Sequence, residues 1–292
     1  MINLEGKKAV IFGGKNGLLG QSVTTALNKA GVSTIALSRS DFDPLDDTSL
    51  NSFLDRESPD YIINTIAYTK VDQAEEETSQ AHLLNTTLPV MLARAAKTHN
   101  AAFVHYSTDF VFDGTKDHPY TENDTTNPVS VYGQTKLAGE TEIFKLGYEK
   151  VFIIRTAWLF GPHKTNFVHK ILNLAKDRDN LTVVHDQNGS PTYTPDLALH
   201  TVQLLESDCH GLYHIVNSGK SSWCELADEA INCAGIDCRV EPVPSSAYPT
   251  IATRPPYSVL DTQKFTEVTG ITPRPWVQAL RDYVYNDFKE LD

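Results

Sequence analysis

The sequence lacks any long apolar run. No stretch approaches the roughly 18 residues that a membrane-spanning helix needs. The opening MINLEGKKAV has acid and glycine where a signal peptide would be apolar. We therefore expect a cytoplasmic protein without a membrane partner.

Cysteine and basic charge are also scarce. The formal net charge is -12 and no Lys/Arg cluster offsets it locally, which argues against nucleic acid as a partner. The cysteines form no CxxC pair and have no histidine at metal-ligand spacing, so we expect reduced thiols and no metal site. They are Cys209, Cys224, Cys233 and Cys238.

Short apolar runs alternate with helical patterns in the first half of the chain, which has 292 residues and 40% hydrophobic content. This alternation predicts βαβ units and an α/β fold with a doubly wound parallel sheet of the Rossmann type. The expected strands are 7–14, 32–38, 59–68, 101–110 and 150–160, and the expected helices are 17–31, 80–99 and 131–144.

The pattern loosens beyond Gly161, which suggests a second, smaller lobe. We expect residues 1–160 to form the dinucleotide-binding domain and residues 161–292 to form mainly a smaller substrate-binding lobe. Segments near 181–205 and 248–262 are expected to return to the first domain, so no clean linker should separate the two.

The run AVIFGGKNGLLGQ places Gly14, Gly17 and Gly20 between an expected strand and an expected helix. Glycines in this position let the backbone approach a pyrophosphate, and the helix N-terminus offers free N–H groups. The alternative is a glycine-rich turn with no ligand. The strand–loop–helix context favours nucleotide binding.

The second strand ends in Ser38 and Arg39, where an acid would usually bind the 2′-hydroxyl of the adenosine ribose. A hydroxyl and a guanidinium suit a 2′-phosphate, so we predict NADP in preference to NAD, with NAD possible as a second cofactor. Arg39 could instead be an ordinary exposed arginine. Asp43 could meet the adenine edge or start a turn with Pro44.

Tyr132 and Lys136 are four positions apart in an expected helix, so they share one face. A free phenol has a pKa of about 10, and a nearby cation lowers it toward the range in which the phenol is a useful acid. Thr108 ends the preceding strand and could share a substrate oxygen with Tyr132. The alternative, two unrelated surface residues, loses weight beside the glycine loop.

Six motifs occur in a fixed order from Gly13 to Asp261: GGKNGLLG, STDFVFDG, YGQTK, RTAWLFG, DQNGSPT and ATRPPYSVLD. In this order they resemble the extended short-chain dehydrogenase/reductases, and within them most closely the dTDP-4-dehydrorhamnose reductases. The resemblance implies reduction of the C4 ketone of dTDP-4-dehydro-6-deoxy-L-mannose by NAD(P)H, giving dTDP-L-rhamnose. It also allows a homodimer.

The resemblance further implies roles for single residues. Thr108, Tyr132 and Lys136 fall on the family's catalytic triad, and Asp109 and Trp158 fall on residues that line its sugar pocket. The positions that fall on its cofactor contacts are Leu18, Leu19, Asp43, Thr65, Ile66 and Ala67. Ile66 departs from the usual small residue and could crowd the nicotinamide.

Three further residues are candidates for substrate contacts, and two of them, Trp158 and Arg254, have a second interpretation. The Trp158 indole could pack on the apolar face of a 6-deoxy sugar or be a core residue. Asn166 and Arg254 could hold the nucleotide diphosphate, and Arg254 could instead form a salt bridge. The sequence leaves open a thymidine or a uridine carrier.

Rival functions remain within the same broad group. A dehydratase would need an acid where this chain has Phe110, which disfavours elimination. A nucleotide-sugar epimerase or another nucleotide-sugar reductase would share the Tyr and the Lys. A non-catalytic, NADP-binding protein similar to the regulatory subunit of methionine adenosyltransferase would also keep most of these motifs.

Overall fold

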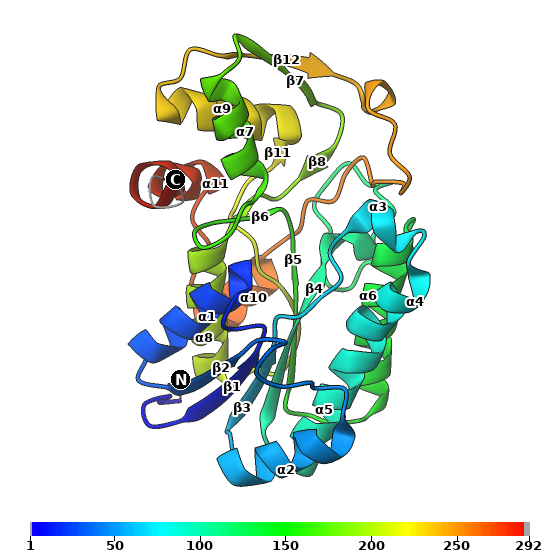
Figure 1. The fold of residues 1–292 in the computed structure, drawn as a ribbon, viewed down its shortest axis with the longest axis vertical. Helices are drawn as coiled ribbons and strands as arrows, with labels where there is room; N and C mark the ends of the chain where they lie inside the picture. Colours follow the sequence, from blue (N-terminus) through cyan, green and yellow to red (C-terminus); the bar gives the residue numbers. More distant parts are fainter. Residues whose placement is uncertain (1, 289–292) are drawn as a thin grey trace.

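A six-stranded parallel sheet organises the chain, which the computed structural model describes over residues 2–288 (Figure 1). The strand order is β10-β5-β4-β3-β1-β2. The strands are β1 (Lys8–Phe12), β2 (Ser33–Leu37), β3 (Tyr61–Asn64), β4 (Ala102–Thr108), β5 (Val151–Thr156) and β10 (Gly211–His214). The predicted doubly wound α/β class is confirmed.

Burial on both faces explains why the middle strands are mostly apolar. Every residue of β3, β4 and β5 is buried, as expected for parallel strands that have helices on both sides. The edge strand β2 has one buried residue, Leu37, and is more exposed elsewhere.

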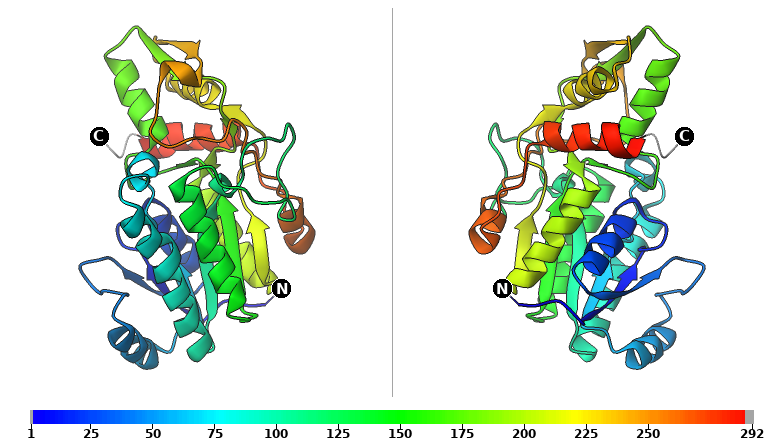
Figure 2. Two further views of the ribbon diagram at one scale, coloured as in Figure 1. Left: turned by 90° about the vertical axis from the view of Figure 1, so that its right-hand side faces the viewer. Right: turned by 90° about the vertical axis from the view of Figure 1, so that its left-hand side faces the viewer.

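Helices cover both faces of the sheet (Figure 2). On one face α1 (Leu18–Lys29), α8 (Thr194–Ser207) and α10 (Gln263–Thr269) share a core with the strands. On the other, α2 (Asp47–Glu57), α5 (Leu88–Thr98) and α6 (Val131–Lys145) form a second core.

The strand order indicates where a ligand would bind. The chain leaves β1 to pair with β2 on one side and later pairs β3 with the other side of β1. In such sheets ligands bind outside the carboxyl ends of the strands where the winding reverses. We therefore expect the site at the loops that follow β1 and β3.

The predicted helix over 80–99 consists of three pieces. They are α4 (Thr78–His82), the π-helical turn η1 (Leu83–Thr87) and α5. Asn85, inside the π turn, bonds both the amide and the carbonyl of Tyr68, at 2.9 and 3.2 Å. This turn therefore fastens the loop after β3, which contains the short helix α3 (Val71–Ala74).

The smaller lobe has its own core and lies beyond the carboxyl edge of the sheet. It contains α7 (Phe167–Lys176), α9 (Trp223–Ala234), α11 (Trp276–Asp282), the π turn η4 (Tyr283–Asp287) and the parallel pair β7 (Asn180–Val184) and β12 (Arg239–Val243). The remaining short elements are the pair β6 (Leu159–Phe160) and β9 (Thr192–Tyr193), the pair β8 (Asn188–Gly189) and β11 (Ser221–Ser222), and the 3₁₀ turns η2 (Asp109–Val111) and η3 (Ser245–Ala247).

The chain returns to the large sheet differently from the expected boundaries. The return begins at α8, whereas β7, inside the expected segment 181–205, pairs within the smaller lobe. In addition β10 adds a sixth strand beside β5, and α10 packs on the same core. The pairing of β10 with β5 depends on long-range packing, which local periodicity in the sequence does not reveal.

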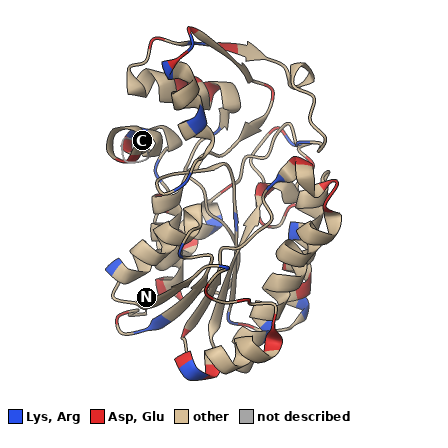
Figure 3. Cartoon of the chain, viewed as in Figure 1, with Lys and Arg blue, Asp and Glu red and all other residues tan. Residues whose placement is uncertain are grey.

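Within residues 2–288, no helix is long and apolar enough to cross a membrane. Over the same range no group of three or more His, Cys, Asp or Glu residues could hold a metal ion. Figure 3 shows acidic and basic residues interspersed over both lobes. The four cysteines are free thiols.

Candidate active site

The glycine loop after β1 is closed tightly on itself. The amide of Gly17 donates to the carbonyl oxygen of Gly13 at 3.0 Å. A Cβ on Gly17 would lie 2.6 Å from that oxygen, and a Cβ on Gly20 only 2.2 Å from it. Both positions therefore require glycine. Gly14 lies against the side chain of Ile11, where a Cβ would come within 2.9 Å.

The loop opens α1, whose first turn leaves amides without intrahelical partners. Leu18 is half-buried, and the Leu19 side chain is in the core, so only its backbone is suited to contact a cofactor. The partial positive charge of this helix end is suited to an anion.

The loop after β3 lies directly beside the glycine loop. A Cβ on Gly13 would fall 2.6 Å from the Thr65 hydroxyl, which itself donates to the Phe12 carbonyl at 2.8 Å. Thr65 and the two residues that follow it, Ile66 and Ala67, are all half-buried. The residues expected to contact a cofactor are thus brought together at the point where the sheet reverses its winding.

The Gly20→Ala change tests the close packing of the glycine loop. The added methyl group would overlap the Gly13 carbonyl, so the loop must move. We expect a loss of stability of about 1–3 kcal/mol, typical of overpacking, and at least about tenfold weaker NADPH binding, since an altered loop loses contacts worth 1.4 kcal/mol or more. Thermal unfolding and fluorescence titration measure both, with the exposed Thr25→Ala on the same helix as control. Unchanged NADPH affinity would contradict the assignment.

The end of β2 carries an acid that the sequence analysis missed. Asp41 accepts hydrogen bonds from the Ser38 hydroxyl at 2.5 Å and from Lys15 at 2.9 Å. These bonds, that from Ser38 foremost, lower the pKa of Asp41 to about 2. Arg39 is exposed, so an anion can reach its guanidinium from solvent. The Ser38 hydroxyl is already engaged.

Two roles were considered for Asp43, and in the structure it stabilises a turn. Its carboxylate accepts from the amide of Leu45 at 3.0 Å, two residues along the chain. This is the local bond by which an aspartate stabilises a turn. Asp43 is exposed, so its side chain could still be approached from solvent.

Tyr132, Thr108 and Asp109 meet at the carboxyl end of β4. Burial raises the Tyr132 pKa to about 12, which the neighbouring Thr108 hydroxyl offsets only in part. Thr108 donates to the Asp109 carboxylate at 3.0 Å. The Phe110 ring meets the Tyr132 ring edge-on at 5.6 Å between centroids. The phenolic oxygen therefore lies at the sheet edge where the crevice was expected.

Lys136 lies deeper than predicted. Its amine contacts His105 Nε2 at 3.2 Å and donates to the Tyr106 carbonyl at 2.5 Å. Burial lowers its own pKa to about 8. The expectation that Lys136 lowers the Tyr132 pKa is wrong for the protein without cofactor, because burial dominates at both groups.

Ser258, from the ATRPPYSVLD motif, completes the Asp109 environment. Its hydroxyl donates to the second Asp109 oxygen at 2.5 Å, and both residues are buried. Burial outweighs these bonds and raises the Asp109 pKa to about 6. Sequence reasoning gave Ser258 no role, since the two residues are 149 positions apart in the chain.

Trp158 lies at the junction of the lobes in a left-handed backbone conformation, with φ of 48°. Its indole stacks face to face on that of Trp223 at 3.5 Å. Gly189 lies so close that a Cβ there would come within 2.4 Å of the Trp158 ring. Non-glycine residues in this conformation are uncommon and cluster at functional sites. The pair is neither wholly buried nor wholly exposed.

Asn166 does not have the role predicted for it. It caps α7: its oxygen accepts from the His169 amide at 3.1 Å, and its nitrogen donates to the Gly161 carbonyl at 2.9 Å and to Tyr283 at 3.1 Å. Both ends of the amide are used within the protein, so we do not retain Asn166 as a diphosphate ligand. An Asn directly before an apolar helical run is a typical N-cap and could have signalled this.

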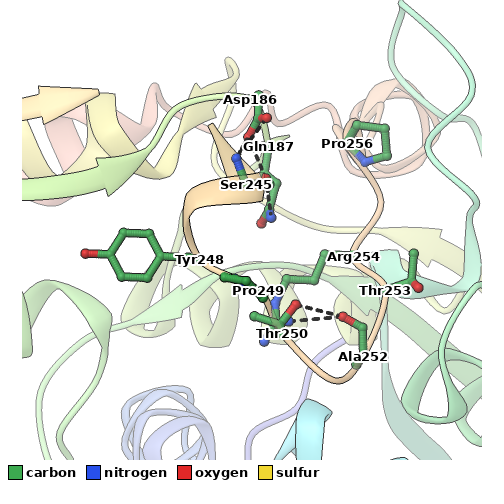
Figure 4. A pocket seen from close by; sticks show the side chains of 10 residues that line it. All are labelled: Asp186, Gln187, Ser245, Tyr248, Pro249, Thr250, Ala252, Thr253, Arg254 and Pro256. Carbon is green, nitrogen blue, oxygen red and sulfur yellow. Dashed lines mark hydrogen bonds between the residues drawn. The ribbon is translucent and has the colours of Figure 1, made fainter. Parts of the chain in front are cut away.

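Arg254 forms the salt bridge that was the alternative to phosphate binding. Its guanidinium contacts both oxygens of Asp72, at 2.8 and 3.1 Å. It also lines a cavity of about 280 Å³ formed by residues 186–187 and by residues between 245 and 256 (Figure 4). Gln187, in the same wall, accepts from the Trp223 indole nitrogen at 3.2 Å. The cavity therefore adjoins the stacked tryptophans.

Comparison with known proteins places this arrangement in a family. Residues 8–288 match the model of the RmlD substrate binding domain. The dTDP-4-dehydrorhamnose reductase of Aggregatibacter actinomycetemcomitans is 39% identical over 286 residues, covering 94% of this chain and 97% of that protein. The dTDP-4-keto-6-deoxy-D-glucose reductase of Streptomyces niveus is 38% identical over 269 residues, covering 91% and 93%.

A solved structure agrees. The dTDP-4-dehydrorhamnose reductase from Bacillus anthracis, crystallised in complex with NADP, superposes with a TM-score of 0.91 at 33% identity, covering 95% of this chain and 98% of that one. A family model that matches nearly the whole chain, together with these relatives, leads to one conclusion: this chain belongs to the RmlD substrate binding domain family, alongside the dTDP-4-dehydrorhamnose reductases.

Proposed function

We propose that this protein reduces the C4 ketone of dTDP-4-dehydro-6-deoxy-L-mannose to dTDP-L-rhamnose with NADPH. The observation that carries the proposal is the position of Tyr132 beside Thr108 at the carboxyl end of β4, on the sheet edge where the glycine loop follows β1. The substrate follows from the relative named for this reaction, which matches 94% of this chain.

NADPH fits the residues present. The close packing around Gly17 and Gly20 leaves backbone where a Cβ would stand, which is the contact a pyrophosphate needs. Arg39 and Lys15 supply cations near the end of β2 for a 2′-phosphate. When bound, the cofactor supplies the hydride. A relative crystallised with NADP supports the choice.

Tyr132 is the proton donor to the sugar oxygen. Thr108 donates its own proton to Asp109, so its oxygen keeps lone pairs that can accept from the Tyr132 hydroxyl beside it. A ketone oxygen that takes the place of the Thr108 oxygen would receive the proton directly, within the reach that general acid catalysis requires. Thr108 would hold the same oxygen by turning its O–H from Asp109 to the ketone, because a hydroxyl has a single proton to donate.

The other substrate contacts lie at the junction of the lobes. The Trp158 indole offers an apolar surface to the methyl group of a 6-deoxy sugar. Arg254 is the cation we propose for the diphosphate, for which it would exchange the Asp72 carboxylate. Free thiols suit the reducing cytoplasm, the location we propose. A homodimer stays a prediction, to be checked by mass measurement in solution.

Replacing Arg39 with alanine tests the cofactor preference. A charge-assisted hydrogen bond is worth about 1.5–3 kcal/mol, so NADPH binding should weaken about 10- to 100-fold while NADH binding is unchanged. Titration of both cofactors measures this. Arg94→Ala, which removes an exposed arginine from α5, is the matched control. Equal losses for NADPH and NADH would remove Arg39 from the 2′-phosphate site.

Turnover tests the function as a whole. We expect NADPH oxidation with dTDP-4-dehydro-6-deoxy-L-mannose and appearance of dTDP-L-rhamnose. Oxidation only with dTDP-4-keto-6-deoxy-D-glucose would assign the sugar specificity of the Streptomyces niveus relative instead. A stable protein that binds NADPH but oxidises none would contradict the proposal and favour the regulatory, partner-binding alternative. Sugar interconversion without net NADPH oxidation would indicate an epimerase.

A further inference from the structure

We propose that Asn64 and His105 are positioning residues for Lys136: they fix the direction of its hydrogen bonds, so that the cofactor-free protein holds Lys136 as a neutral amine that accepts from His105. The importance of Lys136 rests on the proposed function. The direction of the bonds rests on the structure alone.

The three side chains form a continuous buried chain. Asn64, at the end of β3, is the register partner of His105 on β4, so both side chains leave the sheet on the same face. Asn64 Nδ2 lies 3.1 Å from His105 Nδ1, and His105 Nε2 lies 3.2 Å from Lys136 Nζ. The exposed fractions of the three residues are 0%, 0% and 1%.

A backbone amide sets the direction at one end of the chain. The N–H of Ile66 donates to Asn64 Oδ1 at 3.0 Å, which fixes the oxygen there and turns the NH₂ group of Asn64 toward His105. An NH₂ group can only donate. His105 Nδ1 must therefore accept, which leaves the single proton of the neutral imidazole on Nε2.

The proton on Nε2 decides the state of Lys136. An ammonium has three donors and no acceptor, so a charged Lys136 would set donor against donor at 3.2 Å. A neutral amine instead accepts from His105 Nε2–H and donates to the Tyr106 carbonyl at 2.5 Å. Only the neutral amine gives every donor–acceptor contact among Asn64, His105 and Lys136 one donor and one acceptor.

The electrostatic surroundings agree with a neutral amine. Burial lowers the pKa of Lys136 to about 8, and burial is also the largest cause that lowers the pKa of His105 well below its usual value, which keeps the imidazole neutral. Glu140, one turn along α6, favours the charge but is held by Arg155 of β5, at 2.7 and 3.0 Å.

Other ionisable groups on elements packed against α6 are engaged elsewhere. Glu75, after α3, accepts from the Val131 amide at the start of the helix, and Lys97 of α5 donates to the Leu146 carbonyl at its end. Asp109 of η2 is held by Thr108 and Ser258. Among the contacts recorded over residues 2–288, His105 is the ionisable group that touches the amine.

The inference predicts a proton linked to cofactor binding. A ribose hydroxyl offers the amine a new acceptor, which favours the ammonium and raises the Lys136 pKa. A neutral amine must gain a proton to become this ammonium, so NADPH binding should take up a fraction approaching about one proton at pH 9. Calorimetry in buffers of different ionisation enthalpy measures the uptake.

The tautomer of His105 is the direct test. In the cofactor-free, ¹⁵N-histidine-labelled protein, two-bond ¹H–¹⁵N spectra should show His105 with its proton on Nε2; the signal is assigned by its loss in His105→Phe. A proton on Nδ1, or an imidazolium, would overturn the inference. Should His105→Phe fail to fold, the proton uptake of the unaltered protein still decides, and absence of uptake at pH 9 overturns the inference.

Asn64→Asp reverses the direction with almost no change of shape. A carboxylate accepts from His105 Nδ1–H, so Nε2 becomes an acceptor and Lys136 keeps its charge. We expect the tautomer to switch and the proton uptake to disappear. Asn51→Asp is the matched control, because Asn51 contacts His99 at 3.1 Å far from the site. An unchanged His105 tautomer in Asn64→Asp would contradict the inference. If the unaltered protein has its His105 proton on Nε2 but shows no turnover, only the proposed function is contradicted.

Discussion

Replacement of Tyr132 with phenylalanine is expected to lower kcat by about 10²–10⁴, the usual contribution of general acid catalysis. The change removes only the hydroxyl. The ring keeps its edge contact with Phe110, so the fold and NADPH binding should be retained. Steady-state turnover measures kcat, and fluorescence titration measures the affinity for NADPH.

Tyr148→Phe is the matched control for this variant. It removes a hydroxyl that donates to the Ala101 carbonyl at 2.9 Å, from a half-buried tyrosine at the other end of the same helix region. We expect near-normal turnover. A loss below about tenfold in Tyr132→Phe would remove Tyr132 from the proton-donor role, since that is less than general acid catalysis usually supplies.

Replacement of Lys136 with methionine is expected to have the second largest effect. The cation forms with cofactor binding, and an opposite charge nearby lowers an acid's pKa by about 1–3 units. Without it Tyr132 keeps the high pKa that burial gives it, about 12 in the free protein. The pH at which activity declines should therefore move upward by about 1–3 units, with a lower kcat and weaker NADPH binding.

The pH–rate profile distinguishes this role from a structural one. Methionine fills a similar volume, so a packing effect alone would lower activity without moving the profile. Lys145→Met, on the exposed part of α6 where Lys145 pairs with Glu142 at 2.7 Å, should leave the profile unchanged. An unshifted profile in Lys136→Met would mean that the cation does not tune the phenol.

Local patterns were sufficient to predict the parts of the site that lie within single elements. Gly14, Gly17 and Gly20 follow from a strand, a turn and a helix in sequence, and Tyr132 and Lys136 from the helical repeat. The structure brings both groups to one edge of the sheet. The glycine loop is packed more closely than the sequence pattern alone indicates, because the Gly13 carbonyl fills the space that side chains at Gly17 and Gly20 would occupy.

Contacts between distant segments could not be read in advance. Ser258 reaches Asp109 across 149 residues, and the Trp158 indole is stacked on Trp223 from a different element. His105 looked like an ordinary residue in an apolar strand, yet it is the residue that meets Lys136. Sequence spacing carries no information about such pairs, since they depend on how strands and loops are placed by the whole fold.

Chemical type alone also misplaced Asn166 and overstated the freedom of Arg254. An amide and a guanidinium both suit phosphate, but the first is consumed by capping α7 and the second is paired with Asp72. Side chains near a site compete for partners, and the winning partner is decided by geometry. Pairing with Asp72 still leaves Arg254 on the wall of the cavity.

Transfer of label from cofactor to sugar tests the central claim most directly. With NADPH deuterated at the transferring position of the nicotinamide, mass spectrometry and NMR of the product should find deuterium at C4 of the sugar, in proportion to the NADPH oxidised. In Tyr132→Phe the same label should arrive far more slowly. An unlabelled sugar, or sugar converted while the deuterated cofactor stays intact, would contradict the account.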